Sequence, residues 1–282
     1  MKSGLILEGG AMRGMFTAGV IDVLMENGIH FDGIIGVSAG ACFGCNYKSH
    51  QIGRVIRYSK RFAKDPQYCS FRSLLKTGDL YGAQYCYHTV PEKLDPFDNE
   101  TFLKDPSSFY VVCTDAETGE PVYHEITDTD FESLEWIRAS ASMPIVSRPV
   151  EIAGKKYLDG GISDSIPLSW FLQEGYEKNV VVLTQPEGYI KKEMSMLGLM
   201  KIALRKFPNI VKRLETRHDA YNKETELVRE MEKKGEVFVI RPASALVIGK
   251  IEHDPEKMEL VYQMGRDEAQ KNLDALKRFQ SE

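Results

Sequence analysis

A serine flanked by glycines is the clearest chemical feature of this 282-residue sequence. Gly36-Val37-Ser38-Ala39-Gly40 has the G-x-S-x-G pattern of a nucleophile elbow, in which a sharp strand-to-helix turn holds a serine hydroxyl outward. Gly36 and Gly40 would let neighbouring backbone pack closely, and the helix that follows would offer its N-terminal N–H groups to developing negative charge. The pattern predicts that Ser38 is the nucleophile of an acyl-transfer reaction.

A glycine-rich turn near the N-terminus is the second candidate. Glu8-Gly9-Gly10-Ala11-Met12-Arg13-Gly14 lies between an apolar run and a helical pattern, where exposed backbone N–H groups can bind an anion. A P-loop needs Lys and then Ser or Thr where Met15-Phe16 stands, and a dinucleotide loop needs a glycine where Ala11 stands. Both phosphate-binding motifs are therefore excluded. An oxyanion loop beside Ser38 and a purely structural turn remain open.

The third candidate is an aspartate beside two glycines. In Leu158-Asp159-Gly160-Gly161, the absence of side chains at Gly160 and Gly161 would let the Asp159 carboxylate approach another backbone closely, as a general base must. Asp-Gly is also an ordinary turn signal, and on this motif alone a structural turn is the favoured interpretation.

The segments around these motifs alternate between strand and helix patterns. Residues 4–7 form a short apolar run, apolar residues recur at helical spacing over 15–26, and residues 31–37 form a second run before a helix. This order predicts a parallel sheet with right-handed crossovers. The glycine-rich turn and the Ser38 turn would then meet at the ends of adjacent strands.

The chain divides near residue 185. Before it, we expect helices and loops over 48–108 and strands at 109–113, 121–124, 149–152, 156–158 and 180–183. After it, charged helical patterns cover 191–234 and 255–279, and one strand pattern covers 237–241. The sequence therefore predicts a catalytic domain over 1–185 and a mainly helical extension over 186–282.

Composition narrows the class of protein. A net charge of -5 gives no basic footprint for nucleic acid, and no run of about 18 apolar residues is present to span a membrane. The first apolar run is too short for a signal peptide, and five cysteines favour free thiols in a reducing compartment, so we expect a cytoplasmic protein. Cys42 and Cys45 form a CxxC pair. A role as small apolar residues of the core is favoured for them over a redox or zinc site.

Together the three motifs resemble those of the patatin-like phospholipase family. That family carries a G-G-G-x-R/K-G oxyanion loop, a G-x-S-x-G serine and a D-G-G or D-G-A aspartate in this order. Residues 138–144 and 159–167 are similar to two further family segments, so the resemblance covers about residues 4–185. It implies a three-layer α/β/α fold with a mostly parallel central sheet. Ala11 replaces the family's third glycine, which costs on the order of 1 kcal/mol if that position needs a positive φ.

The resemblance also implies a mechanism. Ser38 would attack the ester carbonyl of a lipid or another ester, and Asp159 would take the serine proton directly, forming a dyad without a histidine. Backbone N–H groups of the loop would stabilise the oxyanion, and Arg13 would brace the loop or meet a lipid phosphate. The loop residues concerned are Gly9, Gly10, Ala11, Met12, Arg13 and Gly14. Water would hydrolyse the acyl-enzyme, with no metal and no organic cofactor.

Two alternatives remain open at this point. A Ser-His-acid triad would need a histidine after Asp159 in the usual chain order of α/β-hydrolases, and His218 and His253 are the two that follow it. A lipid- or acyl-binding protein that has kept the scaffold without activity would leave Ser38 unreactive.

Residues 189–217 carry eight basic and two acidic residues, with apolar residues at helical spacing and a break at Pro208. Such a segment can lie on an anionic membrane surface, which would make the protein peripheral to the inner face of the membrane. Packing of the apolar stripe on the domain is the favoured interpretation. Neither the oligomeric state nor the preferred ester follows from these residues.

Overall fold

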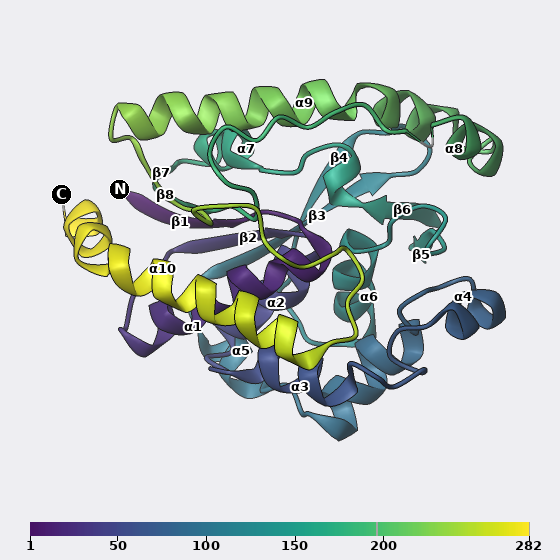
Figure 1. The fold of residues 1–282 in the computed structure, drawn as a ribbon, viewed down its shortest axis with the longest axis horizontal. Coiled ribbons are helices and arrows are strands. Elements are labelled where there is room, and N and C mark those ends of the chain that lie inside the picture. Colours follow the sequence, from purple (N-terminus) through teal and green to yellow (C-terminus); the bar gives the residue numbers. More distant parts are fainter. Residues whose placement is uncertain (196, 282) are drawn as a thin grey trace.

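One mixed sheet runs through the molecule (Figure 1). The computed structural model describes residues 1–195 and 197–281, and within them eight strands are arranged in the order β5-β6-β3-β2-β1-β7-β8, with β4 also paired to β3. The parallel strands are β1 (Lys2–Leu7), β2 (Gly33–Val37), β3 (Ser108–Asp115), β7 (Tyr176–Val182) and β8 (Val237–Ile240). The antiparallel strands are β4 (Pro121–Glu125), β5 (Val150–Ile152) and β6 (Lys155–Asp159). Each strand pattern predicted from the sequence corresponds to one of these strands.

The central strands are buried on both faces, which explains their unbroken apolar sequences. In β1, Leu5 and Leu7 join the core cluster on one face of the sheet, and Ile6 joins the cluster on the other face. β7 alternates in the same way, with Val180 and Val182 on the first face. The sheet is therefore the middle of three layers.

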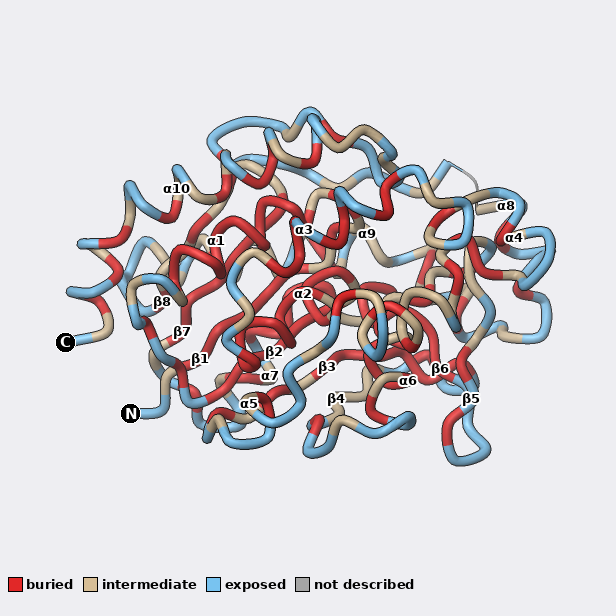
Figure 2. The backbone as a smooth tube through the Cα atoms, turned by 90° about the horizontal axis from the view of Figure 1, so that it is seen from below, coloured by how far each residue is buried: buried red, intermediate tan, exposed pale blue. Residues whose placement is uncertain are grey.

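Helices form the two outer layers. One face is covered by α1 (Gly14–Glu26), α2 (Ala39–Lys48), α3 (Arg54–Phe62) and α10 (Pro255–Ser281), and the other by α7 (Leu168–Gln173) and α9 (Pro208–Lys233) (Figure 1). Figure 2 shows that the central strands and α2 are buried, whereas the outer turns of α10 are exposed. The three-layer α/β/α fold with a mostly parallel sheet is thus confirmed.

Residues 48–108 contain several short helices, of which α3 and α5 contact α2. They are α3, α4 (Phe71–Thr77), a π-helix (Tyr85–Leu94) and α5 (Asn99–Lys104). Pro91 lies inside the π-helix, where an α-helical hydrogen-bond ladder would be interrupted. After β4, α6 (Phe131–Ser140) ends shortly before Pro144, as its sequence predicts.

The C-terminal helix packs directly on the first helix. A Cβ atom added to Gly19 would lie 2.0 Å from the Tyr262 carbonyl oxygen, and one added to Gly265 would lie 2.0 Å from the Phe16 carbonyl oxygen. The two helix backbones are therefore in contact at both glycines. The Tyr262 hydroxyl also donates a 2.6 Å hydrogen bond to Asp22 of α1. With β8 extending the sheet, residues after 185 contribute to the common core, and the boundary near 185 stays a prediction.

The helical pattern predicted over 191–234 is divided into two helices. α8 (Leu197–Ala203) is followed by α9, which begins at Pro208, where the missing N–H is tolerated. Most of the apolar stripe packs inward, in a cluster of Ala116, Leu158, Ile162, Met200, Leu204, Ile210 and Leu214. Leu199 and Ile202 of α8 are exposed. Within the described ranges, no helix has the length and apolar character needed to cross a bilayer.

Candidate active site

Ser38 occupies the sharp turn between β2 and α2. Its backbone has φ 55° and ψ -118°, a conformation that an L-residue adopts only when the surrounding structure enforces it. The flanking glycines permit this turn: a Cβ added to Gly36 would lie 2.4 Å from the Gly40 carbonyl oxygen, and one added to Gly40 would lie 2.2 Å from that of Leu7. The strained backbone and the half-buried hydroxyl are those of a nucleophile elbow.

A short segment at the end of α6 holds both candidate residues. The Ser38 N–H donates a 3.0 Å hydrogen bond to the Ser140 hydroxyl, which itself donates to the Val112 carbonyl at 2.6 Å. Two residues further on, the Ser142 carbonyl accepts a 3.0 Å hydrogen bond from the Asp159 N–H. The segment 140–142 therefore fixes the backbones of Ser38 and Asp159 relative to each other.

Asp159 ends β6 and lies beside Ser38. One carboxylate oxygen, Oδ1, accepts a 2.8 Å hydrogen bond from the Gly161 N–H. The other, Oδ2, is buried and has no hydrogen-bond partner among the described residues. A Cβ added to Gly160 would lie 2.1 Å from the Val112 carbonyl oxygen, so only glycine fits there. The Asp-Gly-Gly motif thus brings the carboxylate against β3, next to the serine turn.

The electrostatic environment of Asp159 combines burial with nearby positive charge. Burial raises its pKa, whereas the Ser38 hydroxyl, the charge of Arg217, the Gly161 N–H and the charge of Lys250 lower it. The Ser38 hydroxyl is close enough to affect the carboxylate, although no hydrogen bond of standard geometry joins the two side chains. Oδ2 is therefore available to accept the Ser38 proton.

The glycine-rich loop between β1 and α1 lies against the serine. A Cβ added to Gly9 would lie 3.1 Å from the Ser38 Cβ. Ala11 has φ 49°, the left-handed conformation that favours glycine, so the alanine carries the strain of about 1 kcal/mol that the sequence suggested. The N–H groups of Gly10, Ala11 and Met12 donate to no acceptor in the part of the chain that the structure describes. They are the candidate donors of an oxyanion hole.

Hydrogen bonds to Glu8 fix the start of this loop. Glu8 is buried, and its carboxylate accepts hydrogen bonds from the backbone N–H of Thr184 at 2.5 Å and from the Tyr221 hydroxyl at 2.6 Å. Arg13 stands at the other end of the loop, before Gly14 starts α1, and its Nε is buried without a hydrogen-bond partner among the described residues. The loop is therefore held at one end and carries an unsatisfied donor at the other.

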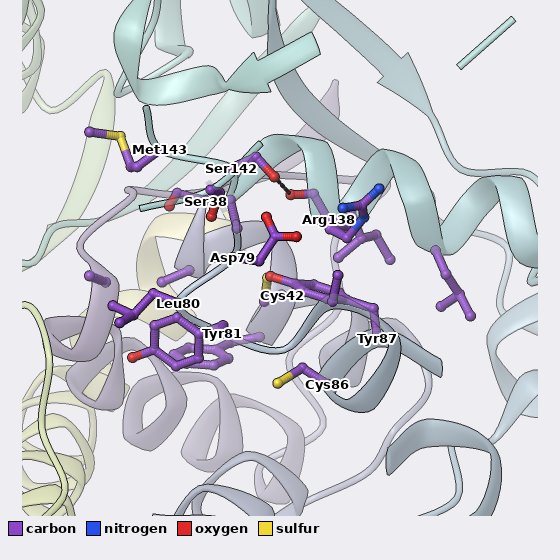
Figure 3. A pocket seen from close by; sticks show the side chains of 18 of the residues that line it. Ser38, Cys42, Asp79, Leu80, Tyr81, Cys86, Tyr87, Arg138, Ser142 and Met143 are labelled. Atoms are coloured by element: carbon purple, nitrogen blue, oxygen red, sulfur yellow. Dashed lines mark hydrogen bonds between the residues drawn. The ribbon is translucent and has the colours of Figure 1, made fainter. Parts of the chain in front are cut away.

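A mostly apolar cavity of about 470 Å³ opens at Ser38 and extends between α2, α3, the π-helix and α6 (Figure 3). Its lining includes Cys42, Tyr58, Leu80, Tyr87, Val90 and Phe102. Asp79 also lines it, but its carboxylate accepts a 2.9 Å hydrogen bond from the Arg148 N–H. Ordinary ligand pockets have volumes of about 300–1,000 Å³, so the cavity is large enough for a lipid acyl chain.

The CxxC cysteines lie on α2 and are free thiols. Burial raises the pKa of Cys42 to about 12 and that of Cys45 to about 11, so both thiols are protonated at neutral pH. Cys45 is buried, and Cys42 is half-buried at the cavity wall.

The two histidines of the triad alternative lie elsewhere. His218 Nε2 lies 3.4 Å from the Asp219 carboxylate and 3.9 Å from that of Glu193. His253 Nδ1 lies 2.8 Å from the Ala63 carbonyl oxygen. Among the described residues that line the cavity there is no histidine. The geometry therefore brings Ser38 to a carboxylate and not to an imidazole.

Sequence reasoning missed several residues of this site. Ser140 and Ser142 belong to a segment noted only for its resemblance, and their alternation with alanine at a helix end carries no chemical signal of its own. Arg217 and Lys250 lie in the charged C-terminal pattern, where nothing distinguishes them from solvated neighbours. Their proximity to Asp159 follows from the tertiary fold alone.

Comparisons with known proteins identify the family of this chain. Residues 5–172 match the family described as patatin-like phospholipase, and residues 207–281 match a domain of unknown function, DUF6363. The uncharacterized protein YjjU of Escherichia coli is 30% identical over 86% of this chain and 69% of its own length. The lysophospholipase NTE1 of Scheffersomyces stipitis is 30% identical over 64% of this chain, which spans only 11% of that protein.

Among solved structures, VipD from Legionella pneumophila aligns with a TM-score of 0.49 and 15% identity over 97% of this chain and 67% of that chain. The family match covers more than half of the 282 residues and includes the loop, the serine and the aspartate. The chain therefore belongs to the patatin-like phospholipase family.

Proposed function

We propose that the protein is a serine acyl hydrolase that cleaves carboxylic ester bonds of lipids through a Ser38–Asp159 dyad. The observation that carries this proposal is the strained Ser38 turn beside a buried carboxylate oxygen that has no partner among the described residues. A nucleophile and a base within reach of each other, both held by backbone hydrogen bonds, satisfy the geometric requirement for nucleophilic catalysis.

The reaction proceeds in two halves. The Ser38 Oγ attacks the ester carbonyl carbon while its proton passes to Asp159 Oδ2, and the bond to the leaving alcohol then breaks as that alcohol takes the proton from Asp159. In the second half, a water molecule gives a proton to Asp159 and attacks the acyl-enzyme. The carboxylic acid leaves and Ser38 regains its proton. No metal or organic cofactor enters either half.

The raised pKa of Asp159 supports its role as a base. A carboxylate of ordinary pKa is a poor acceptor for a serine proton, and burial moves the pKa toward the working pH. The N–H groups of Gly10, Ala11 and Met12 would stabilise the tetrahedral oxyanion, since each is free and the loop lies against Ser38. Loss of one such donor costs roughly 3 kcal/mol in comparable sites.

The apolar cavity supports a lipid acyl group as the carboxylic part of the substrate. Most of its lining is aromatic or aliphatic, as at Tyr58, Leu80 and Val90, which suits an acyl chain. The relative from Scheffersomyces stipitis is named a lysophospholipase, which agrees with an ester that carries a single acyl chain. We propose a phospholipase A, lysophospholipase or lipase type of activity.

We further propose that residues 1–185 form the catalytic unit and that 186–282 complete its surroundings. Five free thiols support a reducing, cytoplasmic location. Peripheral contact with a lipid surface is supported by the exposed side chains Leu199 and Ile202 on α8, whose neighbour Met200 lines the cavity.

The test combines a covalent probe with product analysis. A fluorophosphonate should label the native protein and not Ser38→Ala, and a panel of phospholipids, lysophospholipids and glycerides should release fatty acid with the native protein alone. Absence of labelling on the native protein would favour a silent acyl-binding protein. Loss of turnover in His218→Ala or His253→Ala, with labelling retained in Asp159→Asn, would instead favour a triad.

A further inference from the structure

Four cationic side chains surround the candidate active site. Arg13 belongs to the glycine-rich loop, Lys191 to the irregular segment after β7, Arg217 to α9, and Lys250 to the segment before α10. Each acts electrostatically on at least one of the others or on Asp159. Three of the four lie outside residues 5–172, the part of the chain that matches the family.

Arg217 is the cation whose position is best defined. Its Nε donates a hydrogen bond to the Gly161 carbonyl. A Cβ added to Gly161 would lie 3.0 Å from Asp159 Oδ1 and 3.2 Å from an Arg217 Nη. The guanidinium therefore lies directly beside the Asp-Gly-Gly turn.

The two lysines come from separate segments of the chain. Lys250 lines the same cavity as Ser38. Lys191 is fixed through its backbone, whose N–H and carbonyl both pair with the Asn222 side chain at 2.8 and 3.0 Å. Its Nζ lies 4.0 Å from the centre of the Tyr221 ring, whose hydroxyl is bonded to Glu8.

These cations lack counter-charges. None of the four makes an ion pair within 4.0 Å of a carboxylate in the described part of the chain, and the Arg13 Nε is buried without a partner there. The carboxylates that face them are Glu8, already bonded to Thr184 and Tyr221, and Asp159. Arg13, Lys191 and Arg217 are half-buried and Lys250 is exposed, so an anion bound among them would supply the negative charge that the neighbouring residues do not.

The pKa values of Lys191 and Lys250 are consistent with this lack of negative charge. Burial, followed by the charge of Arg217, lowers the pKa of Lys191 to about 8, and Arg13 and Lys250 lower it further while Glu8 raises it. Burial and the charges of Arg217 and Arg13 also lower the pKa of Lys250, and Asp159 raises it. A bound anion would reverse these shifts by supplying the missing negative charge.

We propose that Arg13, Lys191, Arg217 and Lys250 bind the phosphate group of an acylated ligand, and that the C-terminal region thereby supplies the head-group site. This proposal rests on the proposed function, because the ester carbonyl must lie at Ser38 with the acyl chain in the apolar cavity. A phosphate carries one to two negative charges on several oxygens, and guanidinium and ammonium groups, of which this cluster offers two each, are the side chains that bind such oxygens.

Matched ester substrates test the proposal in the full-length protein. Lauroyl glycerol 3-phosphate and lauroyl glycerol share the acyl chain and the scissile ester and differ in the phosphate. In Lys191→Gln and Lys250→Gln, the ratio of kcat/KM for the phosphate ester to that for the neutral ester should fall about fivefold each, and about twentyfold in the double variant. The ratio cancels any effect of Lys250 on Asp159, which both esters share. Lys234→Gln is the control, because Lys234 lies 17 residues, about 25 Å along α9, beyond Arg217.

Binding to Ser38→Ala separates this proposal from the proposed function, because it requires no turnover. Calorimetry should show tighter binding of the phosphate ester than of the neutral ester, and Lys191→Gln/Lys250→Gln should abolish the difference. If a free phosphate is the occupant, inorganic phosphate will bind this cluster saturably while the two esters bind equally. Equal binding of both esters, together with no response to inorganic phosphate, would overturn the anion site.

Discussion

The Ser38 backbone N–H donates its hydrogen bond to the side chain of Ser140, 102 residues away in the sequence. Ser140 in turn donates to the Val112 carbonyl, so its hydroxyl joins β3, α6 and the elbow. The Ser38 N–H is therefore already occupied and does not contribute to an oxyanion hole. The glycine-rich loop and the first residues of α2 then remain as sources of backbone donors.

Removal of the Ser140 hydroxyl tests this connection. Ser140→Ala leaves the buried Ser38 N–H and the Val112 carbonyl without their partner, so we expect unfolding free energy to fall by about 2 kcal/mol and fluorophosphonate labelling of Ser38 to slow. Ser142→Ala is the matched control, because its hydroxyl contacts only the Arg138 carbonyl while the backbone bond to Asp159 remains. Denaturant unfolding and labelling rates measure both effects. Labelling of Ser140→Ala at the native rate would show that the hydrogen bonds of Ser140 are not needed to position Ser38.

The pH dependence of hydrolysis reports on Asp159. The base must be ionised, so kcat/KM should fall as the pH drops through its pKa, which burial raises above 3.8. The charge of Arg217 lowers this pKa, so Arg217→Gln should move the acidic limb to higher pH. Arg213→Gln is the control on the same helix, since Arg213 pairs with Glu120 at the surface.

The measurement is kcat/KM for a neutral ester between pH 4 and 8, where the substrate itself does not titrate. Asp159→Asn should lower kcat by about a hundredfold or more, in line with the usual contribution of a general base. An acidic limb that does not move in Arg217→Gln would assign the limb to another group.

The positive φ of Ala11 makes the glycine-rich loop slightly strained. Ala11→Gly removes a left-handed penalty of about 1–2 kcal/mol but increases the freedom of the unfolded chain, so we expect a net stabilisation of about 0.5 kcal/mol with activity retained. Ala11→Val should destabilise, because a β-branched residue tolerates positive φ poorly. Midpoints of urea unfolding compare the three proteins. A stabilised Ala11→Val would contradict the assigned conformation.

Asp22 links folding stability to pH. Burial, opposed by hydrogen bonds from Tyr262 and Gly53, raises its pKa from 3.8 to about 6 in the folded protein. The folded state therefore holds this proton more tightly than the unfolded state, and stability is present below pH 3.8 and lost as the pH rises to 6. The loss amounts to about 3 kcal/mol for a shift of roughly two pKa units.

Asp22→Asn removes this titration and keeps an oxygen to accept the hydrogen bonds of Tyr262 and Gly53. Relative to the native protein, the variant should therefore gain about 3 kcal/mol between pH 4 and pH 7. Urea unfolding of both proteins at both pH values gives the difference between their free energies of unfolding. The contribution of the other carboxylates cancels in this difference because both proteins share them. A constant difference would mean that Asp22 has the same pKa in both states.

Lipid-surface contact is tested at α8. Leu199 and Ile202 are 57% and 72% exposed, so replacing both with Glu should leave the fold intact. Co-sedimentation with anionic vesicles should then fall several-fold, while hydrolysis of a soluble ester stays unchanged. Equal co-sedimentation of native protein with neutral and anionic vesicles would remove the electrostatic part of this contact.

Much of the fold was predictable because its signals are local. The strand at 4–7, the helix at 15–26 and the Ser38 turn each follow from apolar spacing and glycine positions within a few residues. The proximity of Ser38 and Asp159 has no such local signal. One crossover, two hairpins and α6 separate them in the chain, and only the family resemblance suggested that they meet. The positions of Ser140 and Arg217 had no local signal, since serines at helix ends and arginines on charged helices are common.

The close contact of α10 with α1 affects how the protein can be shortened. A chain cut after residue 185 would lose the partner of Gly19 and the strand beside β7, and it would present an apolar helix surface and an unpaired sheet edge to solvent. Such a fragment is expected to aggregate during expression, even though it contains every residue of the proposed dyad and loop. Engineered versions should therefore retain both chain ends, and fusion partners are better attached at Met1, which is 80% exposed.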